Sequence, residues 1–392
     1  MKGPKTFFAA CGPGFEGVLA AELRGIGAAE IVERRGGVEF LGDARTGMQA
    51  CLRLRTALRV QEQLLEVPAR GPRELYAAVA ELDWEALSGP DRTIAVDATV
   101  RDSDMTHSQY AALVVKDAVV DQLRERCGRR PDVDTESPDL PLRLHLRENT
   151  ARLYRDWSGE SLHKRGWRPA LVKSPLNEAT AAGLLLLTEW DRESPLADPM
   201  CGGGTFLVEA AHLAMDRAPG LRRSFAFERW PDYDDRAWRA LRREAEQRVK
   251  PGLRFPIEGC DLHPGAIPLA RRAVEAAGVA GVVRVSQGDC RTWNPTRPPR
   301  IVCTNPPWGE RIGEGEDLVA SWKALGNFLH RCSDATAFVL SGNAELTRHL
   351  GLRASRKWVV RNGPIEGRWL RYEIGAPARA GRKREIGYPE RS

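Results

Sequence analysis

The segment 304–309, Thr-Asn-Pro-Pro-Trp-Gly, constrains the fold more than any other part of the sequence. The β-branched residues at 301 and 302 are typical of the end of a buried strand. Two consecutive prolines then prevent the strand from continuing, because proline has no backbone N–H to donate. Asn305 is therefore predicted at the carboxyl end of a strand, which is where open α/β sheets bind ligands.

The residue types of this segment suit transfer of a group to a planar, conjugated amine. Such an amine is a poor nucleophile because its lone pair is delocalised. The side-chain oxygen of Asn305 and a main-chain carbonyl held by Pro306 and Pro307 can accept its two N–H protons, which turns the lone pair towards an electrophile. Trp308 offers a flat face for stacking a base that has been flipped out of its helix. A proline turn with a buried tryptophan is the alternative interpretation, so the motif needs context.

A glycine-rich turn lies upstream at 198–205, with the sequence Asp-Pro-Met-Cys-Gly-Gly-Gly-Thr. Apolar residues precede it at 195–197 and a helical pattern follows at 205–213, which predicts a strand, a tight turn and a helix. The turn lacks the Gly-Lys-Ser/Thr ending of a phosphate loop and the spacing of a dinucleotide fingerprint. A cofactor with an amino-acid group fits it better than a phosphate does; a plain tight turn is the alternative.

Together the two motifs resemble those of the class I S-adenosylmethionine-dependent N-methyltransferases, which have a Rossmann-like α/β fold. The resemblance implies two further cofactor contacts after strands predicted at 255–260 and 282–286. Asp261 would hold the ribose hydroxyls and Asp289 would meet the adenine amine, although Asp261 alone could be a helix cap. The implied cofactor-binding residues are Asp198, Met200, Cys201, Gly202, Gly204, Thr205, Asp261, Asp289 and Asn305, and the implied catalytic residues are Asn305, Pro306, Pro307 and Trp308.

The N-terminal half is predicted to form two small α+β units. Strand-like alternation at 37–40, 94–100 and 142–146 is interspersed with helical patterns. One predicted helix, 48–60, carries Arg53, Arg55 and Arg59 on a solvated face, and another, 111–126, turns Leu113, Val114, Ala118 and Val119 inward.

The order of these elements resembles a THUMP domain, an RNA-binding unit of RNA-modifying enzymes. The resemblance rests on the segments 108–110, 115–118 and 157–159. The expected organisation is a ferredoxin-like unit at 1–62, a THUMP domain at 63–158, a linker at 159–178, the methyltransferase domain at 179–376 and a basic tail at 377–392. An arginine-rich insertion at 215–250 is interpreted as a lid or an outer helix.

Four cations are predicted to contact RNA, because phosphate contacts come mainly from Lys and Arg side chains. They are Lys116, Lys164, Arg165 and Arg168. The last three belong to a basic stretch, 161–169, that also carries an aromatic residue. A solvated linker is the alternative interpretation of this stretch.

Charge, apolar runs and cysteine positions limit the remaining functional classes. The net charge of +6 permits nucleic-acid binding without requiring it. No apolar run reaches the roughly 18 residues of a membrane helix and the N-terminal apolar core is too short for a secretion signal, so a cytoplasmic protein is expected. Cys201, Cys260, Cys290 and Cys303 fall near predicted strand ends; small buried thiols are favoured there over a metal site.

Over nearly its whole length the sequence resembles the large-subunit rRNA guanine-N2 methyltransferases. The resemblance implies S-adenosylmethionine as cofactor and RNA as partner (rRNA, possibly tRNA), with no membrane or metal, and it identifies no protein partner. Trp308 stands where tyrosine is commoner, which keeps stacking but loses a hydroxyl. Some members carry a second methyltransferase domain; this chain ends without one, so one catalytic site is expected. The alternatives are methylation of guanine in tRNA, of adenine N6 in DNA, or of a protein glutamine.

Overall fold

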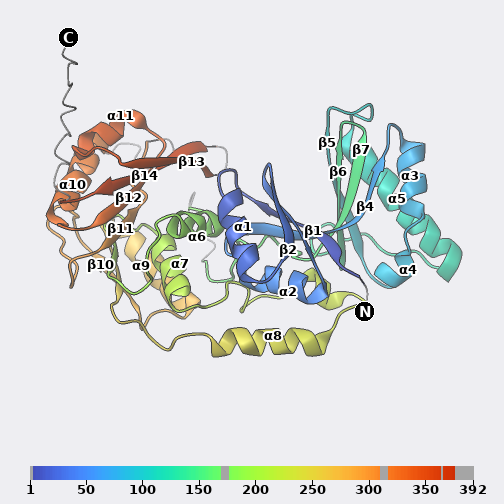
Figure 1. Cartoon of the computed structure of the whole chain (residues 1–392), viewed down its shortest axis with the longest axis horizontal. Coiled ribbons are helices and arrows are strands. Elements are labelled where there is room, and N and C mark those ends of the chain that lie inside the picture. Colours follow the sequence, from blue (N-terminus) through green and yellow to red (C-terminus); the bar gives the residue numbers. More distant parts are fainter. Residues whose placement is uncertain (1–2, 169–175, 310–316, 363–364, 376–392) are drawn as a thin grey trace, which may run out of the picture.

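A computed structural model describes residues 3–168, 176–309, 317–362 and 365–375. Two seven-stranded sheets organise these residues, with the orders β2-β3-β1-β4-β7-β6-β5 and β10-β9-β8-β11-β12-β14-β13. In Figure 1 the second sheet lies on the left, and the first sheet extends from the centre to the right. The expected basic tail and residues 169–175 of the expected linker lie outside the described residues.

The first sheet contains both expected N-terminal units. Its central part consists of β1 (Lys5–Cys11), α1 (Glu16–Gly25), β2 (Ala29–Arg34), β3 (Gly37–Gly42), α2 (Ala44–Arg53) and β4 (Ala57–Pro68). Its outer part consists of α3 (Pro72–Ala80), α4 (Trp84–Leu87), β5 (Ile94–Arg101), α5 (Ser108–Cys127), β6 (Leu140–Arg147) and β7 (Thr150–Asp156). The turn between β6 and β7 has positive φ at both Glu148 and Asn149, as a two-residue hairpin with the favoured twist requires.

Strand β4 joins the two units. Its first half, 57–62, pairs with β1, and its second half, 61–68, pairs with β7. The boundary expected at 62–63 therefore lies inside one continuous strand.

The predicted helix at 48–60 is wrong in its second half, where the chain forms β4. Helix α2 begins after Asp43, whose Oδ1 accepts a hydrogen bond from the Thr46 N–H at 2.8 Å, and it ends at Arg53. Arg55 is buried and donates to the carbonyls of His212 and Arg217, so it does not lie on a solvated helix face. Apolar and polar residues alternate only over 58–61 and 65–67, and so short a pattern does not distinguish a strand from a helix without the pairing of β4 to its neighbours.

Helix α5 corrects one further prediction. Val114, Ala118 and Val119 are buried as expected, but Leu113 is 50% exposed. The buried stripe also includes Ala111, and Leu113 lies off it because helix faces repeat every three or four residues.

The second sheet forms the methyltransferase-like domain. Its strands are β8 (Leu196–Asp198), β9 (Ile257–Asp261), β10 (Val283–Gln287), β11 (Ile301–Thr304), β12 (Thr336–Ser341), β13 (Arg356–Asn362) and β14 (Ile365–Glu373). Its helices are α6 (Glu178–Leu186), α7 (Thr205–Ala214), α9 (Ala266–Ala277), α10 (Leu318–Arg331) and the short α11 (Ala344–Thr347), with a 3-10 turn η2 (Arg348–Leu350). Strands β8 to β12 pair in parallel, and β14 runs antiparallel between β12 and β13. The carboxyl ends of β10, β9, β8 and β11 therefore meet, in that order, at one edge.

The insertion at 215–250 contains η1 (Ala226–Arg229) and α8 (Asp235–Gln247), and α8 runs below the centre of the molecule in Figure 1. It packs onto the first sheet. The Arg155 guanidinium of β7 makes two hydrogen bonds to Asp232, at 2.8 and 3.1 Å, and lies 4.2 Å from the centre of the Trp230 ring. The Trp230 indole N–H donates to the Asp139 carbonyl at 2.9 Å. The insertion thus ties the two sheets together and forms the expected outer helix.

Within the described residues no helix is both long and apolar enough to cross a membrane. All eight cysteines are free thiols.

Candidate functional site

The glycine-rich turn leaves β8 and folds onto the end of β9. Gly202 and Gly204 have φ of +51° and +79°, which side chains other than glycine rarely adopt. The Cys201 N–H donates to the Cys260 carbonyl at 2.9 Å, and the Gly202 N–H donates to the Asp261 carboxylate at 2.8 Å. A Cβ atom added to Gly202 would meet nothing within 4 Å, so the turn presents an open backbone surface in front of α7.

Asp261 organises the neighbouring turn as well. One of its carboxylate oxygens accepts the Gly202 N–H and the other accepts the His263 N–H at 2.9 Å. The side chain is buried, whereas the next residue, Leu262, is 57% exposed. A carboxylate oxygen has two lone pairs, so each oxygen can accept a further hydrogen bond from a ligand hydroxyl.

Asp198 ends β8 at the centre of this edge and is almost completely buried. The Met200 N–H donates to its Oδ1 at 3.1 Å. Burial penalises the charged carboxylate and raises the pKa of Asp198 from 3.8 to about 7. The negative charge of this group is therefore costly unless a cation lies beside it.

This raised pKa predicts how stability depends on pH in the absence of ligand. The pKa of Asp198 is higher in the folded state than in the unfolded state. The stability that protonated Asp198 contributes is therefore fully present below about pH 4 and is lost as pH rises through about 7. The loss is on the order of 4 kcal/mol, at about 1.4 kcal/mol per unit of pKa. Asp198→Asn removes the titrating group. In urea titrations, the free energy of unfolding of the variant should therefore rise relative to that of the wild type between pH 4 and pH 8. Parallel stability curves would contradict the raised pKa.

Asp289 lies two residues beyond the end of β10. Its Oδ1 accepts the Arg291 N–H and its Oδ2 accepts the Arg291 Nε–H, both at 2.8 Å. The bond to the Arg291 side chain lowers the pKa of Asp289, which remains a charged acceptor at the rim of the site.

Asn305 follows β11 and lies beside the end of β8. Its Oδ1 is buried and has no hydrogen-bond partner within the described residues. Leaving a buried amide oxygen unpaired costs about 1–3 kcal/mol, so an acceptor of this kind is expected to have a ligand partner. The carbonyl of Pro307 already accepts the Trp322 indole N–H at 2.9 Å, which leaves the Pro306 carbonyl as the second acceptor of the segment.

The Trp308 indole is held in place by β12 and β14. Its N–H donates to the Leu340 carbonyl at 3.0 Å. A Cβ atom at Gly342 would lie 2.6 Å from the ring, and one at Gly367 would lie 3.4 Å from it. One side of the ring therefore rests on glycine backbone. Sequence reasoning missed these glycines, although an isolated glycine in a strand pattern often signals such a close approach.

The four predicted RNA contacts are all paired with acidic side chains. The nitrogen–oxygen distances are 2.8 Å for Lys116–Asp117, 2.6 Å for Lys164–Glu160, 3.6 Å for Arg165–Glu209 and 2.7 Å for Arg168–Glu178. Lys116 and Lys164 remain at the surface, and Arg168 also lies 3.4 Å from Thr205 Oγ1 at the start of α7.

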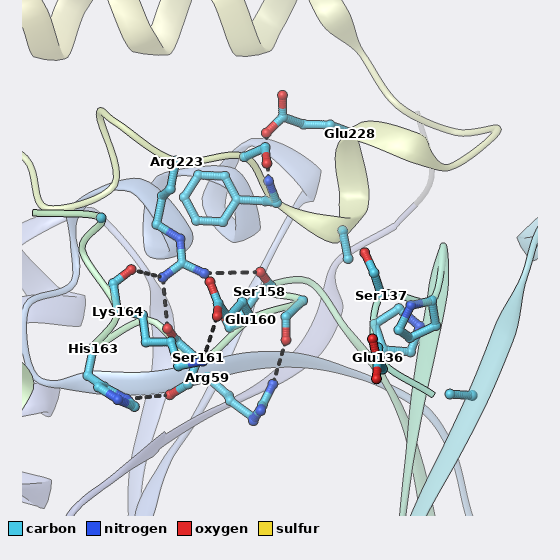
Figure 2. Close-up of a pocket in the computed structure, with 18 of the residues that line it drawn as sticks. Arg59, Glu136, Ser137, Ser158, Glu160, Ser161, His163, Lys164, Arg223 and Glu228 are labelled. Carbon is cyan, nitrogen blue, oxygen red and sulfur yellow. Dashed lines mark hydrogen bonds and ion pairs between the residues drawn. The ribbon is translucent and has the colours of Figure 1, made fainter. Parts of the chain in front are cut away.

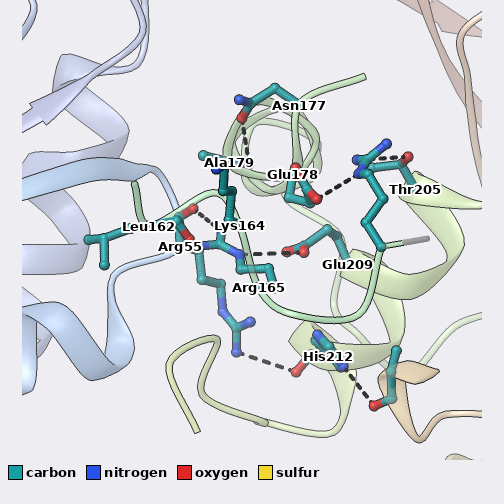
Figure 3. A network of polar contacts seen from close by, with 12 residues as sticks. Arg55, Leu162, Lys164, Arg165, Asn177, Glu178, Ala179, Thr205, Glu209 and His212 are labelled. Atoms are coloured by element: carbon teal, nitrogen blue, oxygen red, sulfur yellow. Dashed lines mark hydrogen bonds and ion pairs between the residues drawn. The ribbon is translucent and has the colours of Figure 1, made fainter. Parts of the chain in front are cut away.

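Arg165 departs from the expectation that it contacts RNA, because its side chain is only 2% exposed. Figure 3 shows it in a buried network between the first sheet, the linker and α7. It donates to the carbonyls of Leu162 and Arg55 and faces Glu209. Its charge is thus used inside the protein.

A groove of about 1440 Å³ lies between the first sheet, residues 158–168 and the insertion (Figure 2). Its cations are also engaged. Arg223 donates to the carbonyls of Ser161 and Lys164, at 2.8 and 3.0 Å, and Arg59 pairs with Asp156 at 2.6 Å. These arginines therefore stabilise the walls of the groove through contacts within the protein.

The four cysteines near the strand ends are buried. Burial raises the pKa of all four thiols, to about 12 for Cys260 and about 11 for Cys290, so they remain protonated and are poor metal ligands. The described residues contain no group of three or more His, Cys, Asp or Glu side chains that could hold a metal ion.

Three family models match the chain. They are described as the RMKL-like methyltransferase domain, over residues 165–371, the THUMP domain, over 70–156, and the RlmL ferredoxin-like domain, over 6–61.

Curated proteins are similar to this sequence over most of its length. A ribosomal RNA large subunit methyltransferase K/L of Syntrophotalea carbinolica is 41% identical over 95% of this chain and 54% of its own length. A Synechocystis protein named as a candidate RNA methyltransferase is 35% identical over 94% of this chain and 97% of its own length. The chain spans about half the length of the K/L relatives that it matches.

A solved structure matches the whole arrangement. It is that of SMU.472, a candidate methyltransferase in complex with S-adenosylhomocysteine (SAH), with a TM-score of 0.88, 28% identity, and coverage of 96% of this chain and all of the other. The matched domain, the relatives and the row of polar groups at the carboxyl edge agree, and the chain therefore belongs to the RMKL-like methyltransferase family.

Proposed function

We propose that this protein methylates the exocyclic N2 of a guanosine in RNA, with large-subunit ribosomal RNA as the substrate. The observation that carries the proposal is the buried Oδ1 of Asn305, which has no hydrogen-bond partner among the described residues and lies in line with Asp198, Asp261 and Asp289 across the carboxyl edge of the sheet. Such an acceptor suits an amine N–H better than a substrate that only accepts hydrogen bonds.

S-adenosylmethionine, when bound, supplies an electrophilic methyl group, and the residues of the edge fit it. The open backbone at Gly202 can approach the amino-acid part, and the costly charge of Asp198 has a natural partner in its ammonium group. Asp261 can accept from ribose hydroxyls, with the exposed Leu262 beside it for an apolar ring face. Asp289 provides a charged acceptor for an adenine amine.

The same edge supports a mechanism that needs no strong base. Asn305 Oδ1 and the Pro306 carbonyl would each accept one N–H of the guanine amine, which directs the nitrogen lone pair out of the ring plane. The nitrogen becomes acidic only as it is methylated, so water can take the proton. Much of the rate then comes from alignment, which is worth roughly 7–11 kcal/mol at best. The partly buried Trp308 ring would stack on the flipped base.

The choice of RNA rests on the matched THUMP domain and on the relatives named as ribosomal RNA methyltransferases. The positive net charge is compatible with it. Because that substrate is cytoplasmic in bacteria, the protein is proposed to act in the cytoplasm. Guanine in tRNA is the main alternative substrate. Methylation of adenine in DNA or of a protein glutamine would leave the THUMP domain without a role.

Mass spectrometry of nucleosides tests the proposal directly. A strain lacking the gene should lose N2-methylguanosine at one position of purified 23S rRNA and retain it in tRNA, and the full-length protein with S-adenosylmethionine should restore it. Loss of N2-methylguanosine from tRNA alone would identify tRNA as the substrate. Unchanged nucleosides in both RNAs would reject methylation of guanine in RNA.

Asp261 provides a prediction for the cofactor. Asp261→Ala should weaken S-adenosylmethionine binding roughly tenfold to hundredfold, because a hydrogen bond to a charged group is worth about 1.5–3 kcal/mol. Calorimetry with the full-length protein measures this change. Asp261→Asn keeps one acceptor oxygen for the Gly202 N–H and separates loss of ligand contact from loosening of the turn. Unchanged affinity in both variants would remove Asp261 from the cofactor site.

A further inference from the structure

The paired state of the predicted RNA contacts raises the question of which cations near the site are available. A cation that already holds a carboxylate or several carbonyls gains less from a phosphate, because both its charge and its N–H groups are in use. This applies to the arginines of the groove in Figure 2 and to Arg165. A phosphate-binding surface should therefore be sought elsewhere along the catalytic edge.

The hairpin of β13 and β14 carries such cations. Lys357 and Arg361 on β13 and Arg368 on β14 are exposed and lie on one face, since Val359 pairs with Arg368 and Glu366 with Arg361. We call these three cations the hairpin cluster. Arg361 is 3.9 Å from Glu366, at the limit of an ion pair, and no ion pair involves Lys357 or Arg368 within the described residues.

The hairpin cluster reaches the edge of the sheet at which the proposed base-stacking residue lies, but on the opposite face of β14, because Arg368 and Gly367 are consecutive residues of a strand. Arg361 and Arg368 lie nearest this edge, and Lys357 lies further from it along β13. Arg368 follows Gly367 in the chain and pairs with Ser341, the residue before Gly342. These are the two glycines on which the Trp308 ring rests. Because β14 runs antiparallel to β12, its start and the end of β13 are at the same edge of the sheet as Asn305.

We propose that the hairpin cluster binds the phosphates that flank the target nucleotide, so that the catalytic domain holds the RNA strand itself while the base is stacked on Trp308. The proposal rests on the proposed function and adds a second contact surface, separate from the THUMP domain. Three cations, with Glu366 as the one acid on this face of the hairpin among its described residues, are complementary to a polyanion. The competing explanation is that charged side chains only protect an edge strand from pairing with other chains.

A pair of double variants of the full-length protein tests the proposal. Lys357→Ala/Arg368→Ala removes two cations of the cluster. Lys250→Ala/Arg284→Ala is the matched control, because both residues are exposed and Arg284 is on β10 at the opposite edge of the sheet. The probe is an unmodified transcript of 23S rRNA, and the measurements are KM, kcat and RNA affinity across a salt titration, with thermal unfolding as a check on folding.

The cluster variant should raise KM for the transcript and lower the slope of log affinity against log salt by about two, one for each lost phosphate contact. The control should keep the wild-type slope, and Lys357→Arg/Arg368→Lys should retain most of the affinity. An unchanged slope in the cluster variant overturns the proposal, and continued methylation by that variant would leave the proposed function intact. Failure of the wild type to methylate any RNA would instead reject the proposed function and this inference with it.

Discussion

Replacing Asn305 by alanine is expected to lower the turnover number roughly 10²–10³-fold while leaving S-adenosylmethionine affinity nearly unchanged. The magnitude is that of losing one preorganised polar contact to the reacting group. The side-chain oxygen is buried and unpaired in the described structure, so it is available to the substrate amine without first breaking another bond. An interaction made mainly in the transition state lowers kcat more than ground-state binding.

Single-turnover methylation of unmodified 23S rRNA, with calorimetry of the cofactor in parallel, measures both quantities. Asn294→Ala is a matched control, because Asn294 is exposed on the loop between β10 and β11 and bonds only to the Thr292 carbonyl within the described residues. Near-normal methylation by Asn305→Ala would show that Asn305 does not orient the substrate amine. Equal loss of turnover and of cofactor affinity would place Asn305 in the cofactor site alone.

The sequence was sufficient for the parts of the fold that depend on local patterns. The glycine turn, the prolines after β11 and the acidic residues after β9 and β10 are short signals whose positions follow from backbone chemistry. The parallel order of the sheet then brings Asp198, Asp261, Asp289 and Asn305 to one edge. The proposed roles of these residues in binding S-adenosylmethionine and guanine follow from this arrangement.

Other features depend on partners that are distant in the chain and could not be predicted from local patterns. The first residues of β4, 57–60, were taken for a helix because the pairing of β4 with β1 and β7 is long-range. The predicted RNA contacts were chosen by residue type, yet Arg165 pairs with Glu209, which is 44 residues further along the chain. A basic stretch cannot reveal whether its charges face solvent or an acid from another element.

Arg165 carries the second large expected effect, which is on stability. Arg165 and Glu209 are both almost completely buried, with Nε 3.6 Å from Oε1, and desolvation raises the pKa of Glu209. Removing one partner of a buried ion pair costs roughly 3–5 kcal/mol, because the other charge is left uncompensated. Arg165→Met should therefore lower the free energy of unfolding by about that amount in urea titrations.

A double-mutant cycle separates this role from an RNA contact. Arg165→Met/Glu209→Leu should recover part of the lost stability, because the uncompensated carboxyl group is removed, while the carbonyls of Leu162 and Arg55 still lack their donor. The slope of RNA affinity against salt should stay at the wild-type value in both variants, since Arg165 does not reach the surface. A slope lowered by about one with unchanged stability would instead show that Arg165 turns outward to bind a phosphate, as the basic stretch alone indicated.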